Sequence, residues 1–256
     1  MVVQIVLALI MGVAVGAVSG YLGSLMLTKR MTLMGGALGH LTLPGVALAL
    51  LYDFDVSLGA ILFLGFGVLL IGVLERKTSL HLEALTAVVF SASLATAFLF
   101  LPKEETDIAL LGDISNISYI TLLVTVLISG GLYLAIKAIY PELILAGISP
   151  DLAKTSGIDL KRNNVIYLVC IAITVALGVR IVGGLMTAAL LAIPACTAKN
   201  ISASLNSYAL ISTLAGGLAS LLGIIVYAFS GIAAGPMIII ASVVLFLFSV
   251  FASVRI

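Results

Sequence analysis

The sequence predicts an all-α protein, a polytopic membrane helix bundle of eight or nine transmembrane helices. Apolar residues make up 62% of the 256 residues, and mean hydropathy is +1.34. Charged residues make up only 9%, whereas a soluble globular domain has roughly 25%. The apolar residues are also gathered into runs long enough to cross a bilayer. Membrane lipid is therefore the expected surrounding of this chain.

Eight apolar runs approach or exceed the ~20 residues that a helix needs to span the hydrocarbon core. They are 2–27, 34–51, 56–74, 84–101, 117–139, 165–182, 208–229 and 237–254. A ninth run, 183–198, is shorter and contains Pro194. It either crosses as a short span or enters as a broken helix covered by protein. We expect residues 1–256 to form a single transmembrane domain.

The basic residues predict the orientation in the cytoplasmic (inner) membrane. If the first five spans alternate, one side of the bundle collects Lys29, Arg30, Arg76, Lys77, Lys137, Lys154, Lys161 and Arg162. The positive-inside rule makes that side cytoplasmic and the N-terminus external. If run 183–198 also crosses, Lys199 and Arg255 fall on the same side. This agreement favours nine spans and a cytoplasmic C-terminus.

Composition and motifs argue against other classes. The net charge of +1 argues against nucleic acid as a partner, because phosphate neutralisation needs clustered Lys and Arg. Cys170 and Cys196 lie inside apolar runs and are expected to act as small hydrophobic residues. The chain has no phosphate-binding GxxxxGK[ST] loop and no visible nucleophile and base, so we do not expect an enzyme. Energy for driven transport would come from another chain or from an ion gradient.

One histidine stands inside an apolar run. His40 lies near the middle of 33–51, where a bilayer would leave its imidazole no water. An ionisable group at membrane depth marks an ion or substrate pathway by default. The alternative is a neutral core histidine bonded to the carbonyl of a neighbouring helix.

The connection 141–164 is the only long one on the cytoplasmic side. Ser149 is suited to cap a helix, Pro150 to its first turn, and Asp151 to the positive end of its dipole. The expected helix covers 150–156 and ends at Gly157. With Leu152 apolar and Lys154 charged, it either docks into a groove on a soluble partner or lies against lipid headgroups or its own bundle.

Several motifs together resemble one family, the membrane permease subunits of ABC importers for zinc, manganese or iron. The resemblance covers nearly the whole chain. It rests on KRM at 29–31 with Gly35, HLTLPGVAL at 40–48, LGD at 111–113, ISPDLA at 148–153 with Gly157, VGGL at 182–185 with IPA at 193–195, and AGP at 234–236. Each motif alone is weak, but their order and topology are specific.

The resemblance implies a mechanism and partners. Two permease copies would surround a pathway, two cytoplasmic ATP-binding subunits would drive it, and an extracytoplasmic metal-binding protein would deliver the cargo. Ser149 to Gly157 would be the coupling helix in the ATPase groove, and His40 would be the intramembrane ligand. No permanently bound cofactor is implied, only the transported divalent metal. Alternatives are a permease for a metal chelate and a gradient-driven secondary transporter.

One position departs from the family pattern. An Asp commonly stands four residues before the ligand histidine, and here that position is Gly36. The remaining candidates for the pathway are Asp113 and Asn116 before the fifth span and Glu83 at the start of the fourth. Asp113 is equally suited to cap a helix, and Glu83 to a surface charge. The acidic outer loops, which include Asp55, either attract cations or carry plain surface charge.

Overall fold

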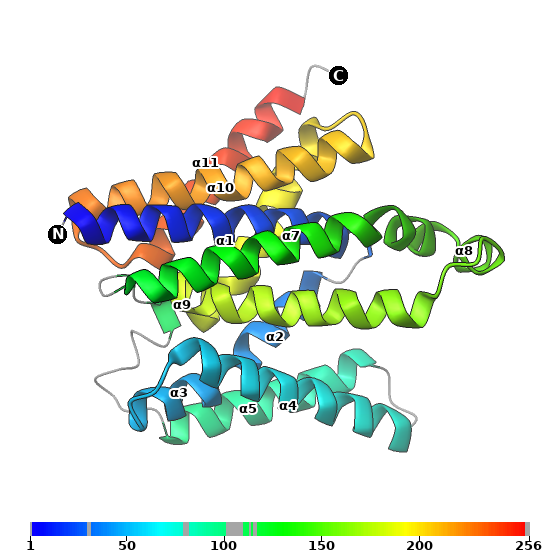
Figure 1. Cartoon of the computed structure of the whole chain (residues 1–256), viewed down its shortest axis with the longest axis horizontal. Coiled ribbons are helices and arrows are strands. Elements are labelled where there is room, and N and C mark those ends of the chain that lie inside the picture. The colour runs from blue at the N-terminus through cyan, green and yellow to red at the C-terminus, as the bar shows by residue number, and fades with distance from the viewer. Residues whose placement is uncertain are drawn as a thin grey trace.

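The chain folds into a bundle of helices (Figure 1). The computed structural model describes residues 2–29, 32–78, 82–100, 110–112, 114 and 117–253. Ten helices occur in these residues: α1 Val2–Thr28, α2 Thr32–Leu41, α3 Leu43–Leu51, α4 Val56–Lys77, α5 Leu82–Phe100, α7 Tyr119–Ile148, α8 Pro150–Thr155, α9 Leu160–Ile201, α10 Leu205–Ser230 and α11 Ala234–Ser253. The predicted fold class is confirmed.

Nine segments of the described chain have the character of membrane spans. Six are long and apolar enough to cross by themselves: Val3–Thr28, Val56–Leu74, Tyr119–Ile148, Arg162–Gly184, Leu205–Ser230 and Ala234–Ala252. Three are shorter apolar helices, Ala37–Leu51, Ala84–Phe100 and Met186–Ile201. They correspond to the nine runs of the sequence and include the short one with Pro194.

Glycines hold α1 against α10 with their backbones in contact. A Cβ atom on Gly16 would lie 2.5 Å from the Gly216 carbonyl oxygen, and one on Gly20 would lie 2.1 Å from that of Ser212. The Ser212 hydroxyl donates to the Gly20 carbonyl at 2.5 Å. Small residues spaced by four allow this close approach in a membrane bundle. The helices α1 and α10 are therefore tightly packed against each other.

The break in the region of 183–198 lies at Gly183, not at Pro194, which stays inside a helix. Gly183 has φ 79° and ψ 165°, outside the helical region. A Cβ on Gly178 would lie 2.9 Å from Thr187 Cγ2, although nine residues of straight helix rise about 13 Å. The two halves of α9 therefore fold back on each other, and the second half recrosses the bundle as the ninth span.

The helices pack in two groups with α2 between them. Helices α1, α7, α9, α10 and α11 form the larger group, and α3, α4 and α5 form the smaller one, seen as separate layers in Figure 1. A Cβ on Gly45 of α3 would lie 2.1 Å from the carbonyl oxygen of Gly59 on α4, so these two helices are closely joined. The groups meet where α4 packs on α9 and where α2 packs on both.

The connection predicted over 141–164 is mostly helical. Helix α7 continues through Pro141 to Ile148, and α9 begins at Leu160, so only a short link containing α8 remains. The Asn163 side-chain amide donates to the Glu142 carboxylate across this link. Lys29 at the end of α1 donates to Asn164 Oδ1 at 3.1 Å and lies 4.8 Å from the centre of the Tyr167 ring. Burial lowers the pKa of Lys29. These contacts tie three helices together at the α8 end.

Replacing Gly183 with Ala should strongly destabilise the protein. Its φ is left-handed, and a Cβ would lie 2.1 Å from the Leu110 carbonyl oxygen. We expect a loss of about 3 kcal/mol or more in the free energy of unfolding, measured by denaturant titration in detergent. Gly130→Ala on α7, where a Cβ meets nothing within 4 Å, is the control and should be neutral or stabilising. Equal losses in both variants would contradict the assignment.

Candidate functional site

Pro44 breaks the second predicted span immediately after His40. The expected continuous helix over 34–51 is instead α2 and α3, joined at Thr42, with Pro44 in the first turn of α3. Proline has no amide hydrogen, so the carbonyl four residues earlier loses its helical partner, and that carbonyl belongs to His40. The Ser93 hydroxyl of α5 donates to it at 3.3 Å instead. The carbonyl that Pro44 leaves without a partner thus receives a hydrogen bond from another helix.

The imidazole of His40 packs against an aromatic ring, and one of its nitrogen atoms is buried. Its Nδ1 atom is buried and has no hydrogen-bond partner among the described residues. Its ring stands edge-on to Phe90 of α5, with centroids 4.9 Å apart. A buried polar atom without a partner is costly and calls for an explanation, and a neutral imidazole nitrogen is a common metal ligand. The alternative interpretation, in which the imidazole donates to the carbonyl of a neighbouring helix, is not met by this atom.

His40 lies at the boundary between the two helix groups. Its neighbour Gly39 packs so closely on the second half of α9 that a Cβ there would lie 2.9 Å from the Gly184 carbonyl oxygen. On the other side, the ring contacts α5 through Phe90. A change in the spacing of the two groups would therefore change the surroundings of the imidazole.

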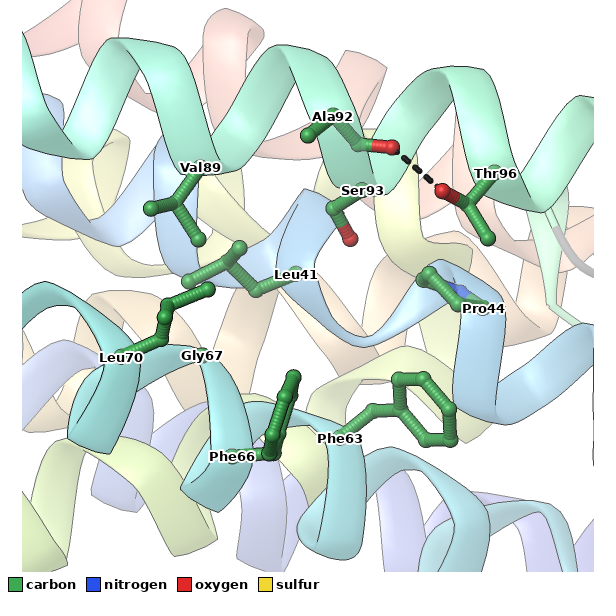
Figure 2. Close-up of a pocket in the computed structure, with 10 residues that line it drawn as sticks. All are labelled: Leu41, Pro44, Phe63, Phe66, Gly67, Leu70, Val89, Ala92, Ser93 and Thr96. Atoms are coloured by element: carbon green, nitrogen blue, oxygen red, sulfur yellow. Dashed lines mark hydrogen bonds between the residues drawn. The ribbon is translucent and has the colours of Figure 1, made fainter.

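A cavity of about 180 Å³ adjoins the break (Figure 2). The residues lining it come from the α2–α3 joint, α4 and α5: Leu41, Pro44, Phe63, Phe66, Gly67, Leu70, Val89, Ala92, Ser93 and Thr96. None of these ten carries a carboxylate, imidazole or thiol, the groups that bind transition metals. Thr96 donates to the Ala92 carbonyl of its own helix at 2.7 Å. Side chains of α4, α5 and the α2–α3 joint therefore leave a space between them, next to the segment that carries His40.

The other predicted pathway residues are not brought into a described site. Asp113 and Asn116 lie outside the described residues. Glu83 falls in the first turn of α5, but its side chain lies outside the described part. Gly36 is in α2, one turn before His40. Within the described residues no three His, Cys, Asp or Glu side chains are grouped as a metal site would require, so these three assignments stay predictions.

Sequence reasoning missed an ion pair at the far end of α9's first half. Arg180 Nη1 donates to Asp55 Oδ2 at 2.9 Å. The other oxygen of Asp55 accepts the backbone amides of Ser57 and Leu58 and so caps α4. The Asp55 carboxylate therefore has two structural roles, since it caps α4 and pairs with Arg180. Arg180 could have indicated such a pair from the sequence, because a permanently charged residue near the end of an apolar run needs a partner.

The short helix predicted over 150–156 is confirmed as α8, Pro150–Thr155, whereas its coupling role stays a prediction. Ser149 caps α8 by accepting the Leu152 amide at 3.3 Å, and Gly157 has φ 77°, which ends the turn. Leu152 is 54% exposed although it is apolar, whereas Ala153 is fully buried. Asp151 and Lys154 are exposed and lie 4.0 Å apart. Pro150 occupies the first turn. The helix presents an apolar residue flanked by charges at one end of the bundle.

Comparisons with known proteins agree with the resemblance. The model of the ABC 3 transport family matches residues 1–253. The manganese import permease ScaB of Streptococcus parasanguinis is 31% identical over 95% of this chain and 89% of its own length. The zinc uptake membrane protein ZnuB of Haemophilus influenzae is 27% identical over 97% of both chains. The structure of PsaBC from Streptococcus pneumoniae in complex with Fab aligns with a TM-score of 0.84, at 28% identity, over 94% of this chain and 89% of that one.

The Ser93 bond to His40 should depend on Pro44. Ser93→Ala leaves the His40 carbonyl without its donor, and we expect it to cost about 1 kcal/mol of unfolding free energy. In a Pro44→Ala background, residue 44 supplies an amide, so the same change should cost almost nothing. Thr96→Ala, which removes a bond within α5 only, is the control and should cost the same in both backgrounds. Unfolding in detergent measures all variants, and an unchanged Ser93→Ala cost in the Pro44→Ala background would refute the compensation.

Proposed function

The chain belongs to the ABC 3 transport family as a membrane permease subunit, and we propose that it carries a divalent transition metal ion past His40 into the cell. The observation that carries this proposal is the buried Nδ1 of His40, which has no partner among the described residues. It stands beside a helix break between two groups of helices. The names of the relatives, which concern manganese and zinc, favour these metals over iron or a chelate.

A single imidazole does not complete the coordination of a divalent metal, because Zn²⁺ takes four ligands in most sites and other metals take more. With Gly36 in place of a carboxylate, the other ligands must come from water, from residues outside the described part such as Asp113 or Asn116, or from a second permease copy. We propose that two copies pair around the pathway. A weak set of ligands suits an ion that must leave as readily as it enters.

We propose that the energy of ATP hydrolysis is transmitted to the permease through α8. We propose that its exposed Leu152, flanked by Asp151 and Lys154, sits in a groove on a separate ATP-binding subunit. The contacts at the α8 end support this, because Glu142, Asn163 and Lys29 fasten α7, α9 and α1 together there. A displacement of α8 would therefore move these helices as one body.

The orientation and the delivery protein follow from charge. Lys29, Lys77, Lys154 and Lys199 stand at or near the α8 ends of their helices, which favours that end as cytoplasmic. The N-terminus would then be external and the C-terminus cytoplasmic. A metal-binding protein outside the membrane would deliver the ion to the opposite end, where α4 begins.

Replacing His40 with Ala should reduce metal uptake without preventing assembly. Losing the imidazole removes a ligand, and we expect uptake of Mn²⁺ or Zn²⁺ to fall about tenfold or more. Uptake is measured by elemental analysis of cells in metal-poor medium, and assembly by the amount of protein in the membrane. His81→Ala, at the chain's other histidine, is the control. If deletion of the chain lowers the content of some metal but His40→Ala does not, the pathway assignment fails.

Replacing Leu152 with Asp should uncouple ATP hydrolysis from uptake. Leu152 is largely exposed in the permease alone, so the fold should hold, while an apolar anchor at an interface is lost. We expect metal moved per ATP hydrolysed to fall about tenfold. Leu152→Met keeps the apolar volume and should retain most of the coupling. Normal coupling in Leu152→Asp would exclude this helix from the ATPase groove.

A further inference from the structure

The ion pair between Arg180 and Asp55 joins the two helix groups at the end of the bundle opposite α8. Asp55 precedes α4 of the smaller group, and Arg180 lies three residues before the reversal of α9 in the larger group. Twenty residues separate the start of α9 from Arg180, which is about 30 Å of helix. Figure 1 shows the start of α4 and α8 at opposite ends.

We propose that this ion pair is a latch that closes the metal's entrance and opens in each transport cycle to admit the ion to His40. The latch rests on the proposed function. Both side chains of the ion pair have fixed positions. Asp55 also caps α4 with its second carboxylate oxygen. Arg180 lies just before the reversal at Gly183, and Gly184 packs on Gly39, the neighbour of His40. The latch therefore links α4 to α9, and the Gly184–Gly39 contact links α9 to α2, the helix that carries His40.

The ion pair between Arg180 and Asp55 is weak enough to break and re-form repeatedly. The Arg180 side chain is 20% exposed and that of Asp55 is 49% exposed. A pair that keeps this much contact with solvent is weaker than a buried one, so it can break and re-form with each ATP cycle. The half-open pocket between α4, α5 and the α2–α3 joint leaves space beside α4 for the proposed movement.

Displacement of α8 reaches the latch along the first half of α9. This segment is continuous helix from Leu160 to the corner, and its start is fastened to α7 and α1. A rigid-body movement at the α8 end is thereby transmitted to Arg180 at the other end. Among the described residues, the hydrogen bonds that fasten the start of α9 run to α7 and to the end of α1, so the movement would shift Arg180 relative to Asp55 on the smaller group.

The first test breaks the latch in intact cells that carry the complete transporter. Asp55→Asn retains the helix cap, since Asn and Asp cap equally well, but removes the charge. Without a closed entrance the ion can leak back, so we expect metal moved per ATP to fall about tenfold in Asp55→Asn and in Arg180→Gln. The double variant should lose no more than either single one, because both remove the same bond. Additive losses would overturn the latch.

Asp53→Asn is the matched control for charge. Asp53 lies in the same loop with φ 55°, a conformation that Asn tolerates, and this change removes one carboxylate two residues from Asp55. Uptake of Mn²⁺ and Zn²⁺ should stay within twofold of the unchanged protein, on the order of a surface charge effect. A loss equal to that of Asp55→Asn would mean that general attraction of cations, not the latch, is responsible.

The second test locks the latch. Asp55→Cys and Arg180→Cys are combined in a chain whose Cys170 and Cys196 are replaced by Ala, and a reducible bifunctional thiol reagent joins the two sites. We expect uptake to fall at least about tenfold on cross-linking and to return on reduction, as for a bond that must open. Full uptake by the cross-linked protein would overturn the proposal. If His40→Ala proves harmless, the pathway past His40 fails, but the locking result still decides whether this end opens.

Discussion

The reversal of α9 at Gly183 is the constraint on which the rest of the structure depends. It requires a left-handed φ and a position without a Cβ, because the carbonyl of Leu110 occupies that space. Gly112 and Gly235 also pack against this reversal. A Cβ on Gly112 would lie 2.7 Å from the Ile181 carbonyl oxygen, and one on Gly235 would lie 2.7 Å from that of Val182. Three separate motifs of the sequence thus converge at one point. A bulkier corner would displace α2, which packs on Gly184, and with it His40.

The second constraint is the proline after His40. A proline inside a span frees a carbonyl, and in a membrane that carbonyl needs a donor from another element. Ser93 of α5 supplies it, so the same proline that breaks the span also connects it to the smaller helix group. The half-buried imidazole of His40 then stands where two groups meet and where α2 gives way to α3. An interruption of this kind is typical of sites that bind ions at membrane depth.

The apolar runs predicted the spans well, because length and hydropathy decide what crosses a bilayer. Ser149, Pro150 and Gly157 predicted α8, since caps and left-handed ends act locally. For run 183–198 the sequence left a short span and a broken helix open. The structure shows a continuous helix through Pro194 with the break at Gly183, because a proline is tolerated in a membrane helix where neighbours satisfy the carbonyl that it frees. The position of the break at Gly183 depends on a contact with residue 110 that no local pattern encodes. The pair Arg180–Asp55 joins residues 125 apart in the sequence, so periodicity could not reveal it.

The distribution of small residues explains why motion is expected between the helix groups and not within the larger one. Where Gly16, Gly20 and Gly216 bring α1 and α10 into backbone contact, packing is close and any slide meets steric resistance at once. Around α4 and α5, phenylalanines border a cavity instead, and contacts between flexible side chains can be exchanged at lower cost. The contact of α4 with α5 beside the α2–α3 joint is thus easier to deform than the contact of α1 with α10, and a hinge or shear movement requires such a deformable contact. Because the ring of His40 contacts Phe90 of α5, the proposed movement of the smaller group would change the surroundings of the imidazole, and the proposed binding and release of the ion would then be steps of one conformational cycle.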